Sequence, residues 1–172
     1  GTPVAYRNHP ETGGLVGLFA NPLALRLALG GEPTFDQLLA RVRDAVLGGL
    51  AHQDVPFERL VAELRHERRL DANPLFQVMF TYHGEPLPRA ESGGLSWAAE
   101  PVDNGASVFD LFLFLWDGGD GIDGWLEYST DLFDAATADR LAVQLGILID
   151  AAVRAPGTPV ADLPLLPPDE RA

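Results

Sequence analysis

The segment HQDVPFE, residues 52–58, lies between two stretches that have the hydrophobic spacing of amphipathic helices. Pro56 suits the first turn of the second helix, because the N–H that proline lacks would have no partner there. Asp54 is placed to cap that helix with its carboxylate, and Phe57 begins its apolar face. The segment by itself therefore predicts a helix–helix junction in which these residues have a structural role.

The helix before this junction has the clearest signals in the chain. Thr34 and Gln37 have the spacing of a capping box, in which the two side chains bond each other's backbone N–H groups. We expect the helix to start at Thr34 and to end near residues 50–52. Its apolar face consists of Phe35, Leu38, Leu39, Val42, Val46 and Leu50.

Alternating patterns predict the strands. Leu23, Leu25, Leu27 and Leu29 alternate with smaller or polar residues, which predicts a strand within residues 15–29. Residues 85–94 are polar and contain proline, so they are expected to form a loop. Further strands are expected at residues 75–82, 95–100, 108–116 and 124–130. The last two bracket the turn sequence DGGDGID and should form a hairpin.

A final long helix should begin at Asp134, whose carboxylate can cap it. Its inner face contains Leu141, Leu145, Leu148, Ile149 and Ala152. The tail beyond it is rich in proline, so it is either a linker or an extension that lies on the surface. We predict a folded unit over residues 1–155 and a linker toward a following domain over residues 156–172.

Composition narrows the function classes. The 172 residues suit one domain, and 47% hydrophobic with 22% charged residues is typical of a soluble globular protein. The net charge of −13 repels phosphates and anionic lipids, which argues against nucleic acid or a membrane as a main partner. The chain has no cysteine, which excludes disulfides and thiolate metal sites and fits a cytoplasmic location.

No metal or catalytic motif stands out among the four histidines, and we expect no metal site. Residues 118–126, GGDGIDGWL, match the calcium-binding nonapeptide GGxGxDxUx. That motif works in tandem copies, however, and here a single copy lies between two apolar stretches. A hairpin turn is therefore favoured over a calcium site.

Three segments in order resemble the C-terminal motifs of condensation domains from non-ribosomal peptide synthetases. Residues 16–26, VGLFANPLALR, are similar to the family's IGxFVNTLxLR. Residues 52–58 are similar to HNQDYPFE, and residues 68–76, RRLDANPLF, to RDxSRNPLF. TPVAYR at residues 2–7 and YSTDLFD at residues 128–134 are similar to TPVANR and EYxTDLFD. The resemblance extends over almost the whole chain.

This resemblance implies an α/β fold, namely one lobe of a two-lobed fold like that of chloramphenicol acetyltransferase. We expect a mixed sheet of about five strands with the long helices packed on one face. The family's HHxxxDG motif, whose second histidine acts at the amide-forming step, belongs to the N-terminal half and is not found in these residues. The chain is therefore interpreted as the C-terminal lobe of a condensation domain, an acyltransferase of peptide antibiotic biosynthesis, and is expected to be inactive by itself.

The resemblance also implies which residues line the channel between the lobes. It places no catalytic residue on this chain. Arg69, Asp71 and Ala72 differ from the family's pattern, so no detailed role is carried over for the third segment. The candidates from the family motifs are Gly17, Phe19, Asn21, Arg26, Gln53, Asp54, Pro56, Phe57, Arg68, Asn73 and Pro74.

The same resemblance implies the partners: the N-terminal condensation lobe, donor and acceptor peptidyl carrier proteins, and a neighbouring adenylation domain. No cofactor is expected to bind this chain, and the phosphopantetheine arms of the carriers would bring the substrates. One alternative is a non-catalytic, condensation-like platform that recruits a tailoring enzyme or a carrier protein. An HHxxxDG motif in the sequence preceding Gly1 would favour condensation over that alternative.

Overall fold

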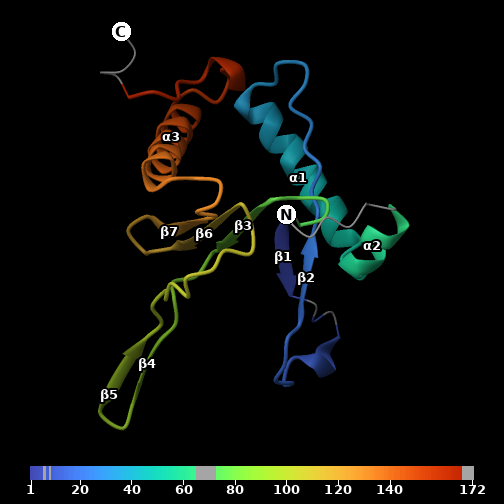
Figure 1. Ribbon diagram of the computed structural model, residues 1–172, viewed down its shortest axis with the longest axis vertical. Helices are drawn as coiled ribbons and strands as arrows, with labels where there is room; N and C mark the ends of the chain where they lie inside the picture. Colours follow the sequence, from blue (N-terminus) through green and yellow to red (C-terminus); the bar gives the residue numbers. More distant parts are fainter. Residues whose placement is uncertain (6, 8, 65–72, 168–172) are drawn as a thin grey trace.

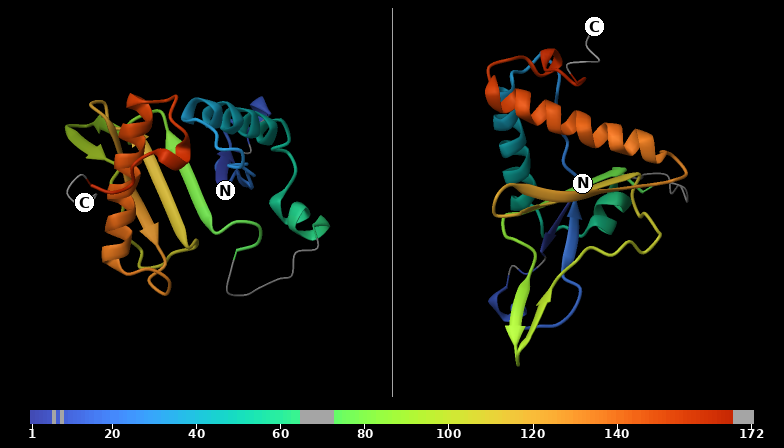
Figure 2. Two further views of the ribbon diagram at one scale, coloured as in Figure 1. Left: turned by 90° about the horizontal axis from the view of Figure 1, so that it is seen from above. Right: turned by 90° about the vertical axis from the view of Figure 1, so that its left-hand side faces the viewer.

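A three-stranded mixed sheet lies at the centre of the computed structural model, which describes residues 1–5, 7, 9–64 and 73–167 (Figure 1). Its strands are β3 (Val78–His83), β6 (Leu111–Asp117) and β7 (Ile122–Tyr128), in the order β3-β6-β7. β3 runs parallel to β6, and β6 and β7 form the predicted antiparallel hairpin. Helix α3 (Ala135–Arg154) crosses one face of this sheet (Figure 2).

A second, two-stranded sheet adjoins this one at Gly1. It pairs β1 (Thr2–Ala5) with β2 (Ala20–Leu23) in antiparallel register. Gly1 N donates to Val78 O at 2.6 Å and Phe80 N donates to Gly1 O at 2.9 Å, so the start of β1 is bonded to β3. The α/β fold class with a mixed sheet is confirmed, but that sheet has three strands rather than about five. β1 and β2 adjoin it through this short contact, and β4 and β5 form a separate pair.

The predicted strand within residues 15–29 is wrong over most of its length, because β2 ends at Leu23. Beyond β2 the chain runs beside α1 (Phe35–Ala51), as Figure 1 shows. There Arg41 Nη1 donates to Ala28 O at 2.8 Å and to Gly30 O at 2.9 Å. A helix side chain thus satisfies carbonyls that a neighbouring strand would otherwise bond. The alternation of leucines could not reveal this, since the partner is a distant arginine.

The helix starts illustrate what local sequence predicts and what it does not. The capping box of α1 is confirmed: Gln37 N donates to Thr34 Oγ1 at 3.3 Å, and Thr34 N to Gln37 Oε1 at 3.1 Å. Asp134 caps α3 as predicted, accepting from Thr137 N at 2.7 Å. Hydrogen bonding by the Thr137 side chain, and next by this backbone N–H, lowers the pKa of Asp134. For α2 (Phe57–Glu63), the predicted cap Asp54 is wrong, because the N-cap residue is Pro56.

One strand lies where a loop was expected. β4 (Arg89–Ser92) falls within predicted loop 85–94 and pairs with β5 (Leu95–Ala98), a strand that was predicted. Gly93 and Gly94 both have positive φ, 60° and 79°, as a two-residue turn of this twist requires. The hairpin projects from the body of the molecule (Figure 1).

The described part of the tail lies across the start of α1. Phe35 N donates to Thr158 O at 3.2 Å and Asp36 N donates to Pro156 O at 3.1 Å, so two helix N–H groups that lack partners within the helix are satisfied. Val160 N donates to Pro33 O at 2.9 Å, and a short 3₁₀ helix (Val160–Asp162) leads to Leu163, which is buried. A second 3₁₀ turn (Pro10–Thr12) lies between β1 and β2.

Few side chains are fully covered in this arrangement. The accessible surface is 12860 Å², about half as much again as the roughly 8,200 Å² typical of a folded monomer of this mass. In the described part of the chain, the buried apolar residues are Leu23, Met79, Ala138, Ala152 and Leu163, together with Pro33. No helix in that part is long and apolar enough to cross a membrane. The elements are therefore well formed, but wide apolar surfaces are open between them.

Removal of the tail tests its contribution to the fold. Deleting residues 156–172 should lower the free energy of unfolding by about 2–3 kcal/mol, because three backbone hydrogen bonds of about 1 kcal/mol each are lost. Deleting only residues 164–172 is the control and should leave the midpoint of a urea melt unchanged. Equal effects of the two deletions would show that these hydrogen bonds do not hold α1.

A measurement of self-association tests whether the apolar surfaces between the elements are open in solution. Wide apolar patches drive association, while the charge of −13 opposes it by a repulsion that salt screens within about 8 Å. We expect the chain to associate at tens of micromolar and to do so more strongly at high salt, as measured by sedimentation velocity. A monomer at both low and high salt would contradict this expectation.

Candidate functional site

The side chain of Asn21 joins β2 to the junction between α1 and α2. Its Nδ2 donates to Gln53 O at 3.0 Å and to Val55 O at 2.9 Å. Its Oδ1 accepts from Phe57 N, the first N–H of α2, at 3.1 Å. Asn21 is 7% exposed, and all three bonds connect segments more than thirty residues apart in sequence. An asparagine on a strand thus serves the N-terminus of α2 in the way that a local cap residue normally does.

Phe57 then connects this junction to the third family-like segment. Its ring centroid lies 5.5 Å from that of Phe76, and Phe76 stacks on Phe109 at 5.8 Å. A Cβ added to Gly1 would come within 2.2 Å of the Phe76 ring, so the backbone at Gly1 lies directly against that ring. The three segments that resemble one family therefore meet in space, around Asn21, Phe57 and Phe76.

A strained turn directs Phe76 into this cluster. Phe76 N donates to Pro74 O at 2.9 Å across Leu75, whose φ is +70°. This is the rarer form of γ-turn, and such strain in a bulky residue persists only where surrounding contacts hold it. Asn73 supplies one of them, since its Nδ2 donates to Val108 O at 2.5 Å. The turn also explains why the predicted strand at residues 75–82 begins only at Val78.

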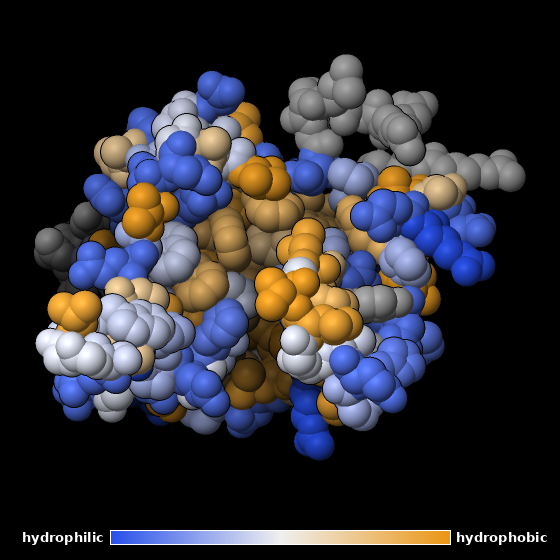
Figure 3. All heavy atoms as spheres, turned by 90° about the horizontal axis from the view of Figure 1, so that it is seen from below, coloured by the Kyte–Doolittle hydropathy of each residue, from blue (hydrophilic) through white to orange (hydrophobic). Residues whose placement is uncertain are grey.

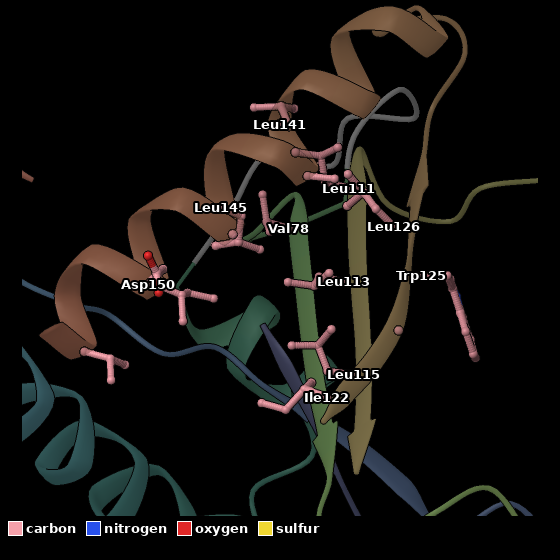
Figure 4. A pocket seen from close by; sticks show the side chains of 15 residues that line it. Val78, Leu111, Leu113, Leu115, Ile122, Trp125, Leu126, Leu141, Leu145 and Asp150 are labelled. Carbon is pink, nitrogen blue, oxygen red and sulfur yellow. The ribbon is translucent and has the colours of Figure 1, made fainter. Parts of the chain in front are cut away.

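The aromatic chain continues along the sheet face that is turned away from α3. Phe112, Phe114 and Trp116 alternate along β6, and Trp125 of β7 stacks on Phe114 at 4.3 Å with an angle of 4°. His83 stacks on Phe114 from the other side at 5.0 Å. In Figure 4 the Trp125 side chain points away from α3. Figure 3, viewed from the side opposite α3, shows a surface that is hollowed and apolar at its centre.

The other residues predicted for the site are not part of the cluster around Asn21, Phe57 and Phe76. The Phe19 ring lies under the Arg7 guanidinium, 4.0 Å from its Cζ, and a Cβ on Gly17 would lie 3.2 Å from the same ring. Arg7 also donates to the carbonyls of Thr12 and Leu15, and so organises the loop between β1 and β2. Arg26 is exposed on the segment beyond β2. Arg68 lies outside the described residues.

The β6–β7 turn has the geometry of a hairpin turn. Gly118 N donates to Gly121 O and Gly119 N donates to Asp117 Oδ1, both at 2.8 Å, and Gly119 has a φ of 90°. Among the described residues, no group of three or more histidine, aspartate or glutamate side chains is placed to hold a metal ion. The turn that the sequence favoured over a calcium site is thus the one observed.

Sequence reasoning missed several residues of the site. Phe76, Phe109 and Gly1 were not among the candidates, and neither was the aromatic face of the sheet. The alternation of Phe112, Phe114 and Trp116 with leucines indicated two faces of different chemistry. No sequence signal indicated that Asn21 reaches the α1–α2 junction, because that contact depends on the tertiary fold.

Comparisons with known proteins give a single family. The family model described as Condensation domain matches residues 1–172. A linear gramicidin synthase protein of Brevibacillus parabrevis is 47% identical over 170 residues, and malpinin synthetase of Mortierella alpina is 44% identical over 171. The match covers 96% and 99% of this chain, respectively, but only 2% of either synthetase.

The fold of solved relatives agrees. The X-domain from teicoplanin biosynthesis superposes with a TM-score of 0.83 at 30% identity, covering 96% of this chain and 38% of that one. The chain therefore spans well under half the length of the relatives that it matches.

Substitution of Asn21 tests its place in the site. Asn21→Ala should lower the free energy of unfolding by about 2–4 kcal/mol, because two carbonyls and one N–H lose their partner in a partly buried position. Asn21→Asp should be at least as damaging, since a carboxylate would face two carbonyl oxygens within 3.0 Å. Urea melts measure both. Asn104→Ala, on an exposed loop, is the matched control, and equal midpoints for Asn21→Ala and this control would contradict the assignment.

Proposed function

The chain belongs to the condensation domain family, and from that premise we propose that it forms one wall of the channel in which carrier-bound thioesters are joined by an amide bond. The observation that carries this proposal is the meeting of the three family segments at Asn21, Phe57 and Phe76. From there the aromatic face runs on across three strands. A continuous, half-buried aromatic surface is suited to enclosing a flexible substrate arm.

In the proposed reaction, the acceptor amine attacks the carbonyl carbon of the donor thioester. A C–N bond forms, the C–S bond breaks, and the carrier thiol leaves, while the amine loses a proton. The phosphopantetheine arms of two carrier proteins would present the two substrates. This chain would supply position and enclosure rather than proton transfer, and well-oriented reactants can gain several orders of magnitude in rate.

The aromatic face would contribute mainly by excluding water. Hydrolysis of the thioester competes with attack by the amine, so a dry wall favours the amide product. Asn21, Gln53 and Pro56 would fix the junction that holds Phe57 against Phe76, while Asn73 and Pro74 would fix the turn before Phe76. Asp54 lies at the exposed side of this junction. Gly17, Phe19, Arg26 and Arg68 remain proposed channel residues on the strength of the family resemblance.

The proposed partners follow from the same premise. They are the N-terminal condensation lobe, the donor and acceptor carrier proteins, and an adenylation domain beyond the linker at residues 156–172. The proposed setting is a peptide synthetase of the cytoplasm. The tail contacts with α1 support a fixed path for the first part of that linker.

The non-catalytic platform is the second candidate. It is favoured by one observation: the X-domain of teicoplanin biosynthesis, solved in a complex with OxyB, is 31% identical to this chain with a TM-score of 0.84. The two candidate functions differ in one requirement that lies outside these 172 residues. A condensation domain needs an HHxxxDG motif, and a platform does not.

A matched pair of alanine substitutions on β6 tests whether the aromatic face forms the proposed channel wall. Phe114 and Leu113 are neighbours on β6, so their side chains lie on opposite faces of the sheet. In a complete condensation domain that carries these residues, Phe114→Ala should lower kcat/KM for dipeptide formation about tenfold, roughly 1.4 kcal/mol in the barrier. Leu113→Ala should change thermal stability but not this rate. Dipeptidyl product released from loaded carriers is measured by mass spectrometry.

Two results would contradict the proposal. If the two variants lose activity in equal proportion to their loss of stability, the aromatic face lines no channel. If this chain alone forms product above the rate of uncatalysed aminolysis, the assignment of the chemistry to other residues is wrong.

A further inference from the structure

The hairpin that joins β6 to β7 is acidic and has a tryptophan on each strand. Residues 117–127 contain four aspartate or glutamate side chains and no lysine or arginine. Trp116 is the last ring on β6, and Trp125 is the ring of β7 that stacks on Phe114. An apolar wall accounts for these rings but not for the negative charge beside them.

The strand register places Asp123 beside both indoles. Asp123 is the cross-strand partner of Trp116, so the two side chains lie on the same face of the sheet. It precedes Trp125 by two residues on β7, which puts those two side chains on one face as well. A Cβ added to Gly118 would clash with the Asp123 carboxylate, so this group lies against the backbone of the turn. Backbone pairing thus fixes a carboxylate next to two tryptophans.

The two indoles meet at an angle rather than in a stack. The ring centroids of Trp116 and Trp125 are 5.3 Å apart and their planes differ by 53°, whereas Trp125 and Phe114 differ by 4°. Planes at such an angle can both face one cation, as the walls of an aromatic cage do, and tryptophan attracts cations more strongly than the other aromatic side chains. Both indoles are partly exposed, so a ligand can reach them.

We propose that Trp116, Trp125 and Asp123 form a site for the cationic side chain, a guanidinium or an ammonium group, of one of the two aminoacyl substrates. The inference rests on the proposed function, in that it takes the aromatic face to line the substrate channel. The indoles would contact the cation with their ring faces, and the carboxylate would pair with its charge. The aspartate alone would be an ordinary surface charge, and the rings alone would be an unselective wall.

The charges on this face favour a cation over other side chains. Glu127, the cross-strand partner of Phe112, adds a second carboxylate to the same face. The basic side chain on this face is His83, which pairs with Trp116 from β3, so β6 separates it from Asp123. An anionic side chain would be repelled by the two carboxylates. A neutral one would cover Asp123 without pairing with it, which costs free energy.

Arginine and citrulline separate charge from shape, because their side chains are nearly equal in size and only arginine is charged. In a complete condensation domain that carries these residues, kcat/KM for dipeptide formation should be about tenfold higher with arginine. One arm places the two residues on the donor carrier and the other arm on the acceptor carrier. A preference in either arm supports the site and identifies the substrate that reaches it.

Two substitutions of the same turn form a matched pair. Asp123→Asn should reduce the preference for arginine to about twofold or less, because the rings are then left without the carboxylate. Asp120→Asn removes the same charge from the exposed tip of the turn and should leave the preference unchanged. Trp116→Leu should act like Asp123→Asn, whereas Trp116→Phe keeps a ring and should retain part of the preference.

Binding supplies a readout that does not depend on turnover. Arginyl and citrullyl pantetheine amides, in which an amide replaces the reactive thioester, are compared by calorimetry on the same domain, and the arginyl compound should bind more tightly. Equal kcat/KM for arginine and citrulline in both arms would overturn the proposal. An equal loss with both substrates on Asp123→Asn would also overturn it, since Asp123 would then serve a contact within the domain. Tighter binding of the arginyl amide without dipeptide formation would contradict only the proposed function.

Discussion

The buried amide of Asn21 is the constraint on which the site depends. A side-chain amide can donate two hydrogen bonds and accept two, and here three of these link one strand to a helix–helix junction. Because Asn21 is 7% exposed, its own amide would lose hydrogen bonds at a cost if these partners were removed. The junction therefore holds one geometry relative to β2. That geometry places the Phe57 ring against Phe76, and through Phe76 and Phe109 it reaches the face of the sheet.

Sequence reasoning succeeded where the determining contacts are local. The capping box of Thr34 and Gln37, the Asp134 cap and the β6–β7 turn each involve residues within a few positions of one another, so the pattern contains both partners. It failed where one partner is distant. The cap of α2 was assigned to Asp54 because only neighbours can be considered in a sequence, whereas the acceptor for Phe57 N comes from residue 21. The leucines after β2 have a strand pattern, yet the neighbouring carbonyls of Ala28 and Gly30 accept hydrogen bonds from Arg41 of a helix.

The candidate site was predictable in its parts but not in its assembly. The family resemblance gave the three segments in order, and Asn21, Phe57, Asn73 and Pro74 lie in or beside the cluster that they form. The resemblance did not give Phe76 as the point of contact, because that depends on the left-handed conformation of Leu75. A bulky residue is a poor candidate for positive φ in any sequence-based argument. The strain becomes understandable only when two hydrogen bonds are considered together: the one that Asn73 donates to Val108 O and the one that Phe76 N donates to Pro74 O.

The alternation along β6 gives the sheet two apolar faces of different chemistry. One face is aliphatic along β6, is crossed by α3 and includes Phe80 and Tyr82 of β3. The other is aromatic and includes groups that can hydrogen-bond, such as the His83 imidazole and the indole N–H groups of Trp116 and Trp125. Aromatic rings with a polar edge tolerate partial contact with water, so this face can remain open to a mobile substrate without the cost that exposed leucines would incur. A sheet buried on both faces normally has aliphatic runs throughout. The aromatic residues at every second position of β6 are therefore the sequence feature that supports the proposed channel wall.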